Sequence, residues 1–474
     1  MPAAGGLNLD AVTIAELHRA MASGQLTAAG LTRAYLDRID AVDAQLGSVV
    51  AVHPDALADA ERTDARRRAG GPPRPLEGVP VLVKDNVAVA GLPTTAGSRA
   101  LLESMPADAP LVSRLRDAGA IILGKTNLSE WANFRDEHST SGWSAVGGQT
   151  HNPHALDRCT SGSSSGSAAA VAASLAQLAI GTETDGSIIS PAGVCGIVGA
   201  KPSLGAVPGA GIVPISSHQD TAGPMARHVA DAALLHAVLC GTTPPDLRGV
   251  TLHGTRIGVW RPSGLDQPTT EAFDAALAAM AAARVTATDI DVDASKIQDA
   301  EWPALLAEFR HDIDAYLAAA PDAAARSLAE LIAFNKADPD ELAHFGQSLL
   351  EQALAAPELD DPTYRERRAA ATREARACLD HALAGVDAVL TVSNDPAWPI
   401  DYAAGDKYDV ETTTPAAVAG YPSVSLPAGF AGTLPIGVSL IGRAGADTDL
   451  WKLAYAFEQA VPARRAPTYG AGAG

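Results

Sequence analysis

Aromatic residues are scarce in this sequence of 474 residues, and no long apolar run is present. Aromatic side chains make up 4% of the chain while apolar residues reach 47%, so a core has to be built from alanine, valine, leucine and isoleucine. No stretch approaches the ~20 apolar residues that a membrane span requires, and the first residues lack the basic start and apolar run of a secretory signal peptide. We therefore expect no membrane association.

Cysteine is also rare, and the cysteines form neither a CxxC pair nor a zinc-like spacing. We expect free thiols in a reducing compartment, and therefore a cytoplasmic protein. The cysteines are Cys159, Cys195, Cys240 and Cys378. The 12 histidines are scattered without an HExxH motif. His151 and His154, on either side of Pro153, are interpreted as loop surface, so we expect no metal and no cofactor.

Basic residues are outnumbered, with 35 Lys and Arg against 55 Asp and Glu, which gives a formal net charge of −20. A strongly acidic surface repels phosphate backbones, so a nucleic-acid partner is not expected. The same charge says little about a small neutral substrate.

Strand-like and helix-like segments alternate along the chain without a dividing linker. This alternation predicts an α/β fold whose sheet, mixed or parallel, is covered by helices, and without a linker we expect a single domain over residues 1–474. Residues 300–384 are acidic, helical by pattern and almost free of glycine, which predicts a helical insertion beside a cleft. Residues 399–414 are polar and irregular, and we expect a loop over the site there.

Several elements near the amino terminus are predicted from local signals. Residues 13–45 carry apolar residues at helical spacing, with Thr13 and Thr27 as N-caps of a helical hairpin. Residues 79–83 read as a short buried strand that ends at Lys84. Gly119 to Thr126 matches the phosphate-loop pattern GxxxxGK[ST]. We reject nucleotide binding there, because Ala-Ile-Ile-Leu between the two glycines favours a buried strand.

The stretch from Arg158 to Gly205 is rich in glycine and serine. A serine loop at residues 161–166 comes first, then a run of small apolar residues, and then a second polar loop at residues 181–190. Within the apolar run, Ser167 to Ala176 is predicted to be a helix capped by the preceding serines. Such loops make tight turns in which backbone N–H groups point at a ligand, so we expect the functional site at the two loops.

Several segments together carry a resemblance to a known family. The chain reads Gly-Ser-Ser-Ser-Gly-Ser-Ala-Ala-Ala at residues 162–170 and Gly-Thr-Glu-Thr-Asp-Gly-Ser-Ile at 181–188. Upstream, Gly-Val-Pro-Val-Leu-Val-Lys-Asp-Asn occupies residues 78–86. These segments resemble the amidase signature family of serine hydrolases. Further matching segments, in the family's order, are residues 124–131, 199–202, 220–225 and 415–422.

The resemblance implies a single α/β domain with a mixed central sheet covered by helices on both faces. It also implies a Ser-Ser-Lys catalytic triad that works through an acyl-enzyme. Ser187 would be the nucleophile, Ser163 would follow a cis peptide bond and relay a proton, and Lys84 would be the base. Backbone N–H groups around Thr184, Asp185, Gly186 and Ser187 would form the oxyanion hole. A lysine base must be neutral near pH 7, so its pKa has to fall from about 10.4 to about 7, at a cost of ~4.6 kcal/mol. Burial among neutral hydroxyls can supply this shift.

Alternative mechanisms use other residues of the same region. Ser164 is the centre of a GxSxG pattern, and a Ser-His-Asp enzyme would need a histidine such as His218, near Asp220. The residues before Ser164 do not resemble the buried strand that this motif requires. Asp220 itself either orients the loops or touches substrate. A non-catalytic protein that kept the fold is disfavoured by the intact Lys84, Ser163 and Ser187.

Positions at which this chain differs from the family pattern bear on which substrate it uses. Many members have Gly-Gly before the nucleophile and an arginine two positions after it, where this chain has Asp185-Gly186 and Ile189. The spelling around these positions looks closest to the peptide amidase branch. This resemblance implies a peptide amide or small-molecule amide as substrate and a monomer or homodimer. The alternatives are a general aliphatic or aryl amidase, a pathway-specific amidase, or a glutaminase subunit of an amidotransferase.

Overall fold

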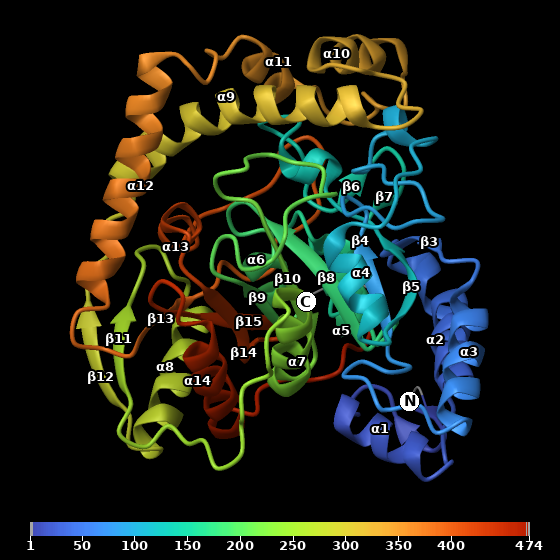
Figure 1. Ribbon diagram of the computed structural model, residues 1–474. Coiled ribbons are helices and arrows are strands. Elements are labelled where there is room, and N and C mark those ends of the chain that lie inside the picture. Colours follow the sequence, from blue (N-terminus) through green and yellow to red (C-terminus); the bar gives the residue numbers. More distant parts are fainter. Residues whose placement is uncertain (1–2, 471, 473–474) are drawn as a thin grey trace.

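The computed structural model describes residues 3–470 and 472. Within these residues, eleven strands form one mixed sheet at the centre of the molecule (Figure 1). The strands, in sheet order, are β12 (Thr286–Ile290), β11 (Arg256–Trp260), β13 (Ala388–Val392), β15 (Leu434–Ile441), β14 (Ser423–Ala431), β9 (Val198–Lys201), β10 (Thr221–Ala226), β8 (Leu178–Glu183), β4 (Pro80–Lys84), β5 (Ile121–Thr126) and β3 (Val49–Val52).

Helices lie on both faces of the sheet, as the family resemblance implies. The helices are α1 (Ile14–Ala22), α2 (Ala28–Val42), α3 (Ala56–Arg68), α4 (Pro110–Asp117), α5 (Ser165–Ala172), α6 (Ile189–Val194), α7 (Val229–Cys240), α8 (Gln267–Ala282), α9 (Ser295–Ala319), α10 (Leu328–Ala337), α11 (Ser348–Leu354), α12 (Pro362–Ala382), α13 (Thr414–Ala419) and α14 (Asp447–Ala460). Two small hairpins stand outside the main sheet, β1 (Ala3–Ala4) with β2 (Leu7–Asn8) and β6 (Trp143–Ser144) with β7 (Gly148–Gln149).

Successive residues of the central strands enter two different cores. In β4, Val81 and Val83 belong to the core that includes α4, α7 and α14, whereas Leu82 belongs to the core that includes α1, α2 and α5. Both faces of a strand buried in this way must be apolar, which explains why residues 79–83 read as one continuous apolar run. β4 runs parallel to β5 and β8, and β10 is antiparallel to β8 and β9, so the sheet is mixed.

Local capping explains the start of the first two helices. Thr13 and Glu16 form a capping box at the start of α1, and the Thr27 hydroxyl accepts from the Gly30 N–H at the start of α2. The two predicted helices and their caps are therefore confirmed, but the predicted hairpin was wrong, because α2 packs against α3 rather than against α1. The alanine-rich helix predicted at residues 167–176 forms as α5, Ser165–Ala172, so the prediction was wrong at both ends and in its serine cap. α5 begins at Ser165 without a side-chain cap, because the serine hydroxyls bind other partners in the site.

Two further sequence interpretations are settled by the strands and helices. Residues 121–126 form β5, so the GxxxxGK[ST] match is a buried strand and not a phosphate-binding loop, as expected. The predicted polar loop at residues 181–190 was only partly right. Its first residues extend β8, and Ile189 starts the short helix α6.

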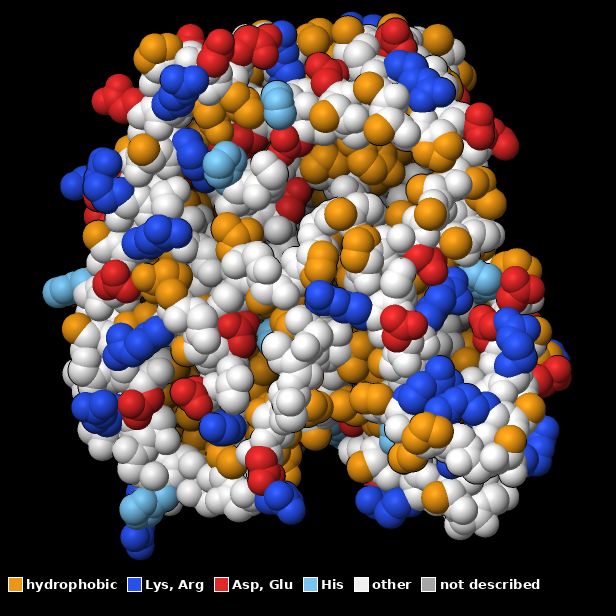
Figure 2. All heavy atoms as spheres, in the orientation of Figure 1, with side chains coloured by type: hydrophobic (Ala, Val, Ile, Leu, Met, Phe, Trp, Pro, Cys, Tyr) orange, Lys and Arg blue, Asp and Glu red, His pale blue; other side chains and the backbone are white. Residues whose placement is uncertain are grey.

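The expected helical insertion is present as α9 to α12. α9, α10 and α11 lie along one end of the molecule, and α12 descends along its side (Figure 1). Acidic and basic side chains are interspersed over the face shown in Figure 2. None of the described helices combines the length and apolar character needed to cross a bilayer.

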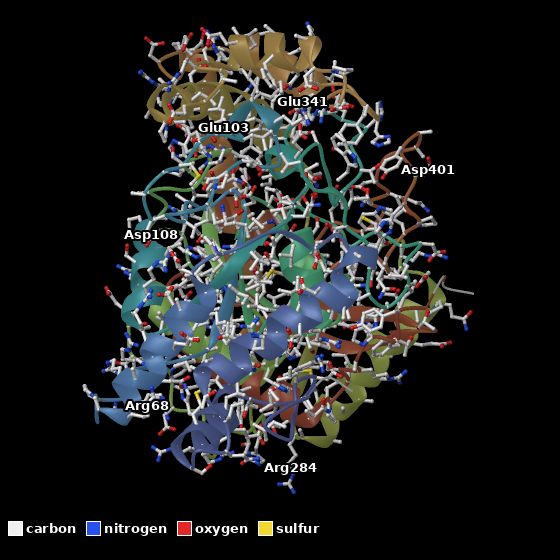
Figure 3. All side chains as sticks on the ribbon, turned by 90° about the vertical axis from the view of Figure 1, so that its right-hand side faces the viewer. Arg68, Glu103, Asp108, Arg284, Glu341 and Asp401 are labelled. Carbon is white, nitrogen blue, oxygen red and sulfur yellow. The ribbon has the colours of Figure 1, made fainter. Side chains whose placement is uncertain are left out.

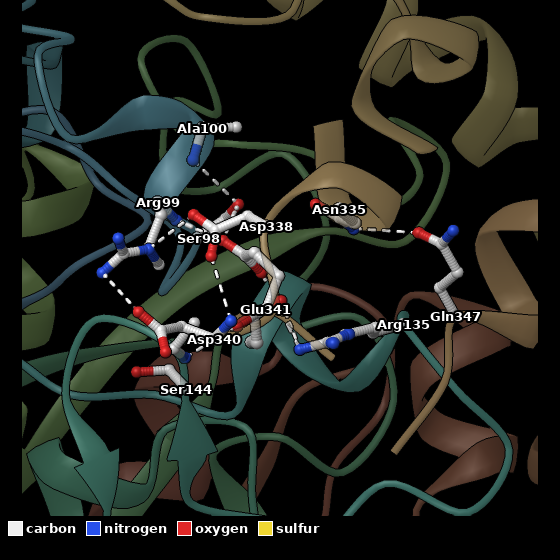
Figure 4. Close-up of polar contacts among 12 residues, drawn as sticks. Ser98, Arg99, Ala100, Arg135, Ser144, Asn335, Asp338, Asp340, Glu341 and Gln347 are labelled. Carbon is white, nitrogen blue, oxygen red and sulfur yellow. Dashed lines mark hydrogen bonds and ion pairs between the residues drawn. The ribbon is translucent and has the colours of Figure 1, made fainter. Parts of the chain in front are cut away.

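Hydrogen bonds and ion pairs fasten this helical layer to the loops beneath it. Glu341, between α10 and α11, accepts a hydrogen bond from the Arg99 N–H at 2.6 Å, and the Arg99 guanidinium pairs with Asp338 at 2.8 Å (Figure 4). The buried Arg135 pairs with Glu130 at 2.7 Å and lies 3.9 Å from Glu341. Figure 3 shows Glu341 among the helices of this end. The insertion is therefore held against the part of the chain that leads into the serine loop.

Candidate active site

A cavity of about 460 Å³ lies between the two serine- and glycine-rich turns, α9, and the loop before α13. The turns contribute Gly162, residues 184–187 and Ser190 to its wall. α9 contributes Glu301, Trp302 and Leu305, and the loop contributes Tyr408 and residues 410–414. The structure therefore brings the predicted oxyanion and nucleophile residues together, and it places the predicted loop at residues 399–414 against them.

Lys84 ends β4 beneath this cavity and has no contact with solvent. Its Nζ lies 2.8 Å from Ser163 Oγ and 3.0 Å from Ser164 Oγ. Thr182 provides the other two neighbours, its hydroxyl at 2.9 Å and its carbonyl at 3.2 Å. Burial lowers the pKa of Lys84 to about 7, against the opposing effect of the charges of Asp220 and Glu183. No carboxylate of the described residues touches the amine, so a large part of the population is neutral near pH 7.

The hydrogen-bond directions suit a neutral amine. Such an amine has two hydrogens and one lone pair, so one neighbouring hydroxyl has to donate to it. Ser164 donates its hydroxyl hydrogen to the Thr182 carbonyl at 3.0 Å, and Thr182 Oγ1 accepts from Asn86 Nδ2 at 2.9 Å. Ser163 Oγ has no other hydrogen-bond partner among the described residues. The Ser163 hydroxyl is therefore free to donate to Lys84 Nζ.

The serine loop is fixed by its own backbone and hydroxyls. The peptide bond between Gly162 and Ser163 is cis, as the resemblance implies. Ser165 Oγ donates to the Ser161 carbonyl at 2.8 Å, and the hydroxyls of Ser161 and Ser190 lie 2.7 Å apart. These contacts tie the first loop to the start of α6, and so to the second loop.

Ser187 lies in the turn between β8 and α6. The Glu183 carboxylate closes this turn by accepting from the N–H groups of Ile188 at 2.7 Å and Ile189 at 3.0 Å. The Ser187 carbonyl accepts from the Ser164 N–H at 3.1 Å, which joins it to the serine loop. Within residues 3–470 and 472, the Ser187 hydroxyl has no hydrogen-bond partner, and it faces the cavity.

The backbone of the same turn is open to a ligand. In the described part of the chain, no oxygen accepts from the N–H groups of Asp185, Gly186 or Ser187. Gly186 has φ of +75°, a left-handed conformation that suits glycine and allows the tight turn. Unpartnered N–H groups beside a hydroxyl are the arrangement that an oxyanion requires.

Two aspartates hold the turn in place. Asp220 accepts from Thr184 Oγ1 at 2.6 Å and from the Ile215 N–H at 2.8 Å, so it orients the loop and is not a wall of the cavity. Burial raises the pKa of Asp220 to about 6. Asp185 accepts from Thr413 Oγ1 and Thr414 Oγ1, both at 2.6 Å. The Asp185 side chain therefore anchors the loop before α13 to the predicted nucleophile turn.

The alternative catalytic groups lie elsewhere. Ser164 points at Lys84 and Thr182, and no histidine is among the residues that line the cavity. His218 lines a separate groove beside α12. The interpretation of His154 as loop surface was wrong, because this side chain is buried and its Nε2 lies 3.2 Å from the Cys195 carbonyl. The described residues contain no cluster of three or more His, Cys, Asp or Glu that could hold a metal ion.

Several residues of the site had no predicted role. Thr182 and Asn86 lie in segments that match the family pattern, and that match could have marked them as site residues. The hydrogen bonds of Thr182 with Lys84 and with Asn86 were not predicted. Glu301 and Asn394 line the cavity from distant parts of the chain, and no motif marks them.

Sequence comparisons match nearly the whole chain to known amidases and related proteins. The family model described as Amidase matches residues 30–451. A probable amidase of Arabidopsis thaliana is 35% identical, with 98% of this chain and 92% of the relative covered. A glutamyl-tRNA(Gln) amidotransferase subunit from Salinispora arenicola is also 35% identical, with 96% of this chain and 98% of the relative covered.

Solved structures are similar over nearly the whole chain. The native peptide amidase of Stenotrophomonas maltophilia is 43% identical with a TM-score of 0.90, and 97% of this chain and 98% of that chain are covered. A peptide amidase bound to the competitive inhibitor chymostatin is 44% identical with a TM-score of 0.92, and 96% of this chain and 99% of that chain are covered.

Proposed function

Because this chain belongs to the amidase family and is a hydrolase of amide bonds, we propose that it releases ammonia from C-terminal peptide carboxamides with Ser187 as its nucleophile. The observation that carries the proposal is the buried Lys84 amine at 2.8 Å from Ser163 Oγ, below a cavity that exposes the Ser187 hydroxyl. The same arrangement serves any carboxamide whose acyl part fits the cavity.

The reaction would proceed in two balanced steps. Ser187 Oγ attacks the carboxamide carbon, its proton passes to Ser163 Oγ, and the Ser163 proton passes to neutral Lys84 Nζ. The proton then returns by the same route to the leaving nitrogen, the C–N bond breaks, and ammonia leaves an ester on Ser187. Water repeats the sequence on this ester and yields the carboxylic acid. Ser163 and Ser187 share no hydrogen bond before substrate binds, and catalytic contacts of this kind commonly shorten in the complex.

The turn beside Ser187 would stabilise the tetrahedral intermediate. The N–H groups of Asp185, Gly186 and Ser187 are available for the carbonyl oxygen as it becomes negative. Such donors are typically worth about 10²–10³ in rate for each one. Asp220 and Glu183 support this role by fixing both ends of the turn.

A peptide amide is favoured over glutamine by the degree of similarity. Over nearly the whole chain, the peptide amidase structures share 43–44% identity with it and the amidotransferase relatives share 32–35%, although one amidotransferase relative reaches 49% over half of the chain. A glutaminase that works within an amidotransferase is the second candidate, because relatives of that name cover nearly the whole chain. In our proposal the enzyme acts alone, as a monomer or homodimer. We place it in the cytoplasm, where the four cysteines would stay unpaired as they are in the structure.

The test is ammonia release from peptide amides, glutamine and aryl amides by the purified chain, with Ser187→Ala as the inactive variant. We expect turnover of peptide amides, a loss of about 10⁴-fold or more in Ser187→Ala, and fluorophosphonate labelling of Ser187 only in the wild type. Ser113→Ala, an exposed serine on α4, is the control and should keep full activity. Glutamine turnover that appears only with a partner protein would favour the second candidate, and undiminished turnover by Ser187→Ala would exclude Ser187 as nucleophile.

A further inference from the structure

The charged residues that line the cavity are all acidic. Asp185 comes from the turn after β8, Glu301 from α9, and Glu411 from the loop before α13. No lysine, arginine or histidine stands among the lining residues of the described chain. Three carboxylates from three separate segments therefore meet at one cavity.

Each carboxylate is held by neutral donors. Asp185 accepts from two threonine hydroxyls, and Glu411 Oε2 accepts from Gln298 Nε2 at 2.6 Å. Glu301 Oε1 accepts from Gln219 Nε2 at 2.7 Å, while Glu301 Oε2 has no hydrogen-bond partner among the described residues. Glu301 is only 5% exposed, and it lines the cavity. Neutral donors fix these groups in position but do not cancel their charge.

The charge of Asp185 disfavours the ionised forms of the other two carboxyl groups. Burial, together with the charge of Asp185, raises the pKa of Glu301 to about 8, and the same two causes raise the pKa of Glu411. Two buried cations stand behind the wall, Lys201 near Asp185 and Arg368 near Glu301. Neither cation lines the cavity, so among the described residues carboxyl groups are the only ionisable acids or bases of its wall besides Tyr408, and a cation bound there would favour their ionised forms.

A second, independent feature points to a polar ligand. Asn394 lines the same cavity and is 5% exposed. Its side-chain atoms Nδ2 and Oδ1 form no hydrogen bond with any described residue. Its Nδ2 is buried without a partner. A buried side-chain amide is almost always satisfied, because an unmade hydrogen bond costs about 1–3 kcal/mol. A substrate that offers a peptide group would provide both a donor and an acceptor to Asn394.

From these two features we infer that the cavity contains a subsite for a positively charged group on the acyl part of the carboxamide substrate. Glu301, Glu411 and Asp185 bind the cation, and Asn394 binds a peptide group of the same molecule. The substrate class is thus cationic peptide amides, with an arginine or lysine side chain close to the amide that is cleaved. This inference rests on the proposed amide hydrolysis, whose substrate it narrows.

Pairs of substrates that differ only in the charge of one side chain test whether the cavity prefers a cation. Citrulline has the shape of arginine but no charge, so kcat/KM is compared for N-acetyl-arginine amide against N-acetyl-citrulline amide, and for N-acetyl-Arg-Leu amide against N-acetyl-Cit-Leu amide. We expect at least one arginine member to exceed its citrulline partner by about tenfold or more, a difference equal to ~1.4 kcal/mol. Equal values in both pairs, or a preference for citrulline, would overturn the subsite while leaving the amidase proposal intact.

Variants of the wall assign the preference to its residues. In Glu301→Gln and Glu411→Gln the arginine-to-citrulline ratio should fall toward one. Glu358→Gln, on an exposed glutamate outside the cavity, should keep the wild-type ratio. Glu411 is exposed, so we expect Glu411→Gln to fold normally. The assignment would be contradicted if Glu411→Gln kept the wild-type arginine-to-citrulline ratio and Glu301→Gln either kept it too or failed to fold. Asn394→Ala should weaken kcat/KM for both members of a pair equally.

Binding to an inactive variant separates this inference from the function on which it rests. Titration calorimetry of Ser187→Ala with the same four amides reads affinity without turnover. Tighter binding of the arginine amides supports the subsite, and equal affinity overturns it. If the wild type hydrolyses none of the amides, the proposed function fails, and the calorimetry still decides the subsite.

Discussion

At the scale of single residues, Lys84 shows how burial prepares a group for proton transfer. Its neighbours are hydroxyls and a carbonyl, and none of them compensates an ammonium charge fully. Loss of hydration therefore decides the balance and lowers the pKa to about 7. Lys125, equally buried, hydrogen-bonds the Asp85 carboxylate at 2.6 Å, and that partner favours its charged form. The two lysines differ in whether a carboxylate is within reach.

We expect the kcat/KM of the enzyme to rise with pH and to reach half of its maximum near pH 7, because Lys84 must be neutral to accept a proton. Lys84→Arg should remove activity at all pH values, since a guanidinium stays protonated. The measurement is ammonia release between about pH 5.5 and pH 8.5. Lys452→Arg, a surface substitution on α14, should reproduce the wild-type profile. A flat profile, or an active Lys84→Arg, would exclude Lys84 as the base.

The sequence was sufficient to predict the reacting residues of the site but not its walls. Lys84, Ser163 and Ser187 lie in segments whose order along the chain is itself a signal, and their catalytic roles stay predictions. Glu301 and Asn394 reach the cavity only because α9 and the segment after β13 fold against the turns. Contacts between segments that are distant in the chain cannot be predicted from the local sequence around either residue.

At the scale of single elements, α5 depends on close approach of its first turn to the backbone of other segments. A Cβ on Gly166 would lie 2.4 Å from the Ser48 carbonyl oxygen and 2.6 Å from the Asn127 carbonyl oxygen. Backbone atoms cannot move aside as a flexible side chain can. The serines before α5 were expected to cap it, but none of their side chains does so. Ser164 donates instead to the Thr182 carbonyl and Ser165 to the Ser161 carbonyl.

Gly166→Ala should therefore destabilise the protein by about 1–3 kcal/mol and reduce kcat, because the helix carrying the serine loop has to shift. Gly209→Ala is the matched control, since a Cβ there meets no atom within 4 Å and should change stability little. Urea unfolding and ammonia release measure the two effects. Equal stability of the two variants would show that the contact at Gly166 relaxes without cost.

The pair of helices α9 and α12 is joined by a buried ion pair. Arg368 on α12 donates to both carboxylate oxygens of Glu308 on α9, at 2.6 and 2.5 Å, and to Gln219 at 2.7 Å. Gln219 in turn donates to Glu301. The wall of the cavity is thus connected to α12 by side-chain hydrogen bonds.

Glu308→Ala should cost about 3–5 kcal/mol of unfolding free energy, because it leaves the Arg368 charge buried without its partner. Glu358→Ala removes an exposed partner of Arg310 and should cost at most ~1 kcal/mol. Denaturant unfolding of both variants provides the comparison. A similar small cost for both would mean that water or another acceptor replaces Glu308.

At the scale of the whole molecule, one sheet collects strands from both ends of the chain. β3 and β12 are its edges, and β14 pairs with β9 near the middle although their positions in the sequence are far apart. The α/β class and the helical insertion were predictable from the alternation of patterns. The strand order was not, because pairing of distant segments leaves no local trace in the sequence.

We expect the chain to unfold as one unit, as its predicted single domain implies, because the buried Glu341 of the insertion pairs with Arg135 and accepts a hydrogen bond from the Arg99 N–H of the core. Hydrogen exchange in low urea should give the slowest amides of α9 and of β10 the same dependence on denaturant. A shallower dependence for α9 would instead mean that the insertion opens separately from the sheet.

The cavity takes its reacting groups from residues before position 190 and its far wall from α9 and from the loop that reaches Thr414. A ribosome that has delivered only the first half of the chain has made the proposed nucleophile but not the wall that would enclose an amide around it. We therefore expect a chain that ends before α9 to lack amidase activity even though it contains Lys84, Ser163 and Ser187.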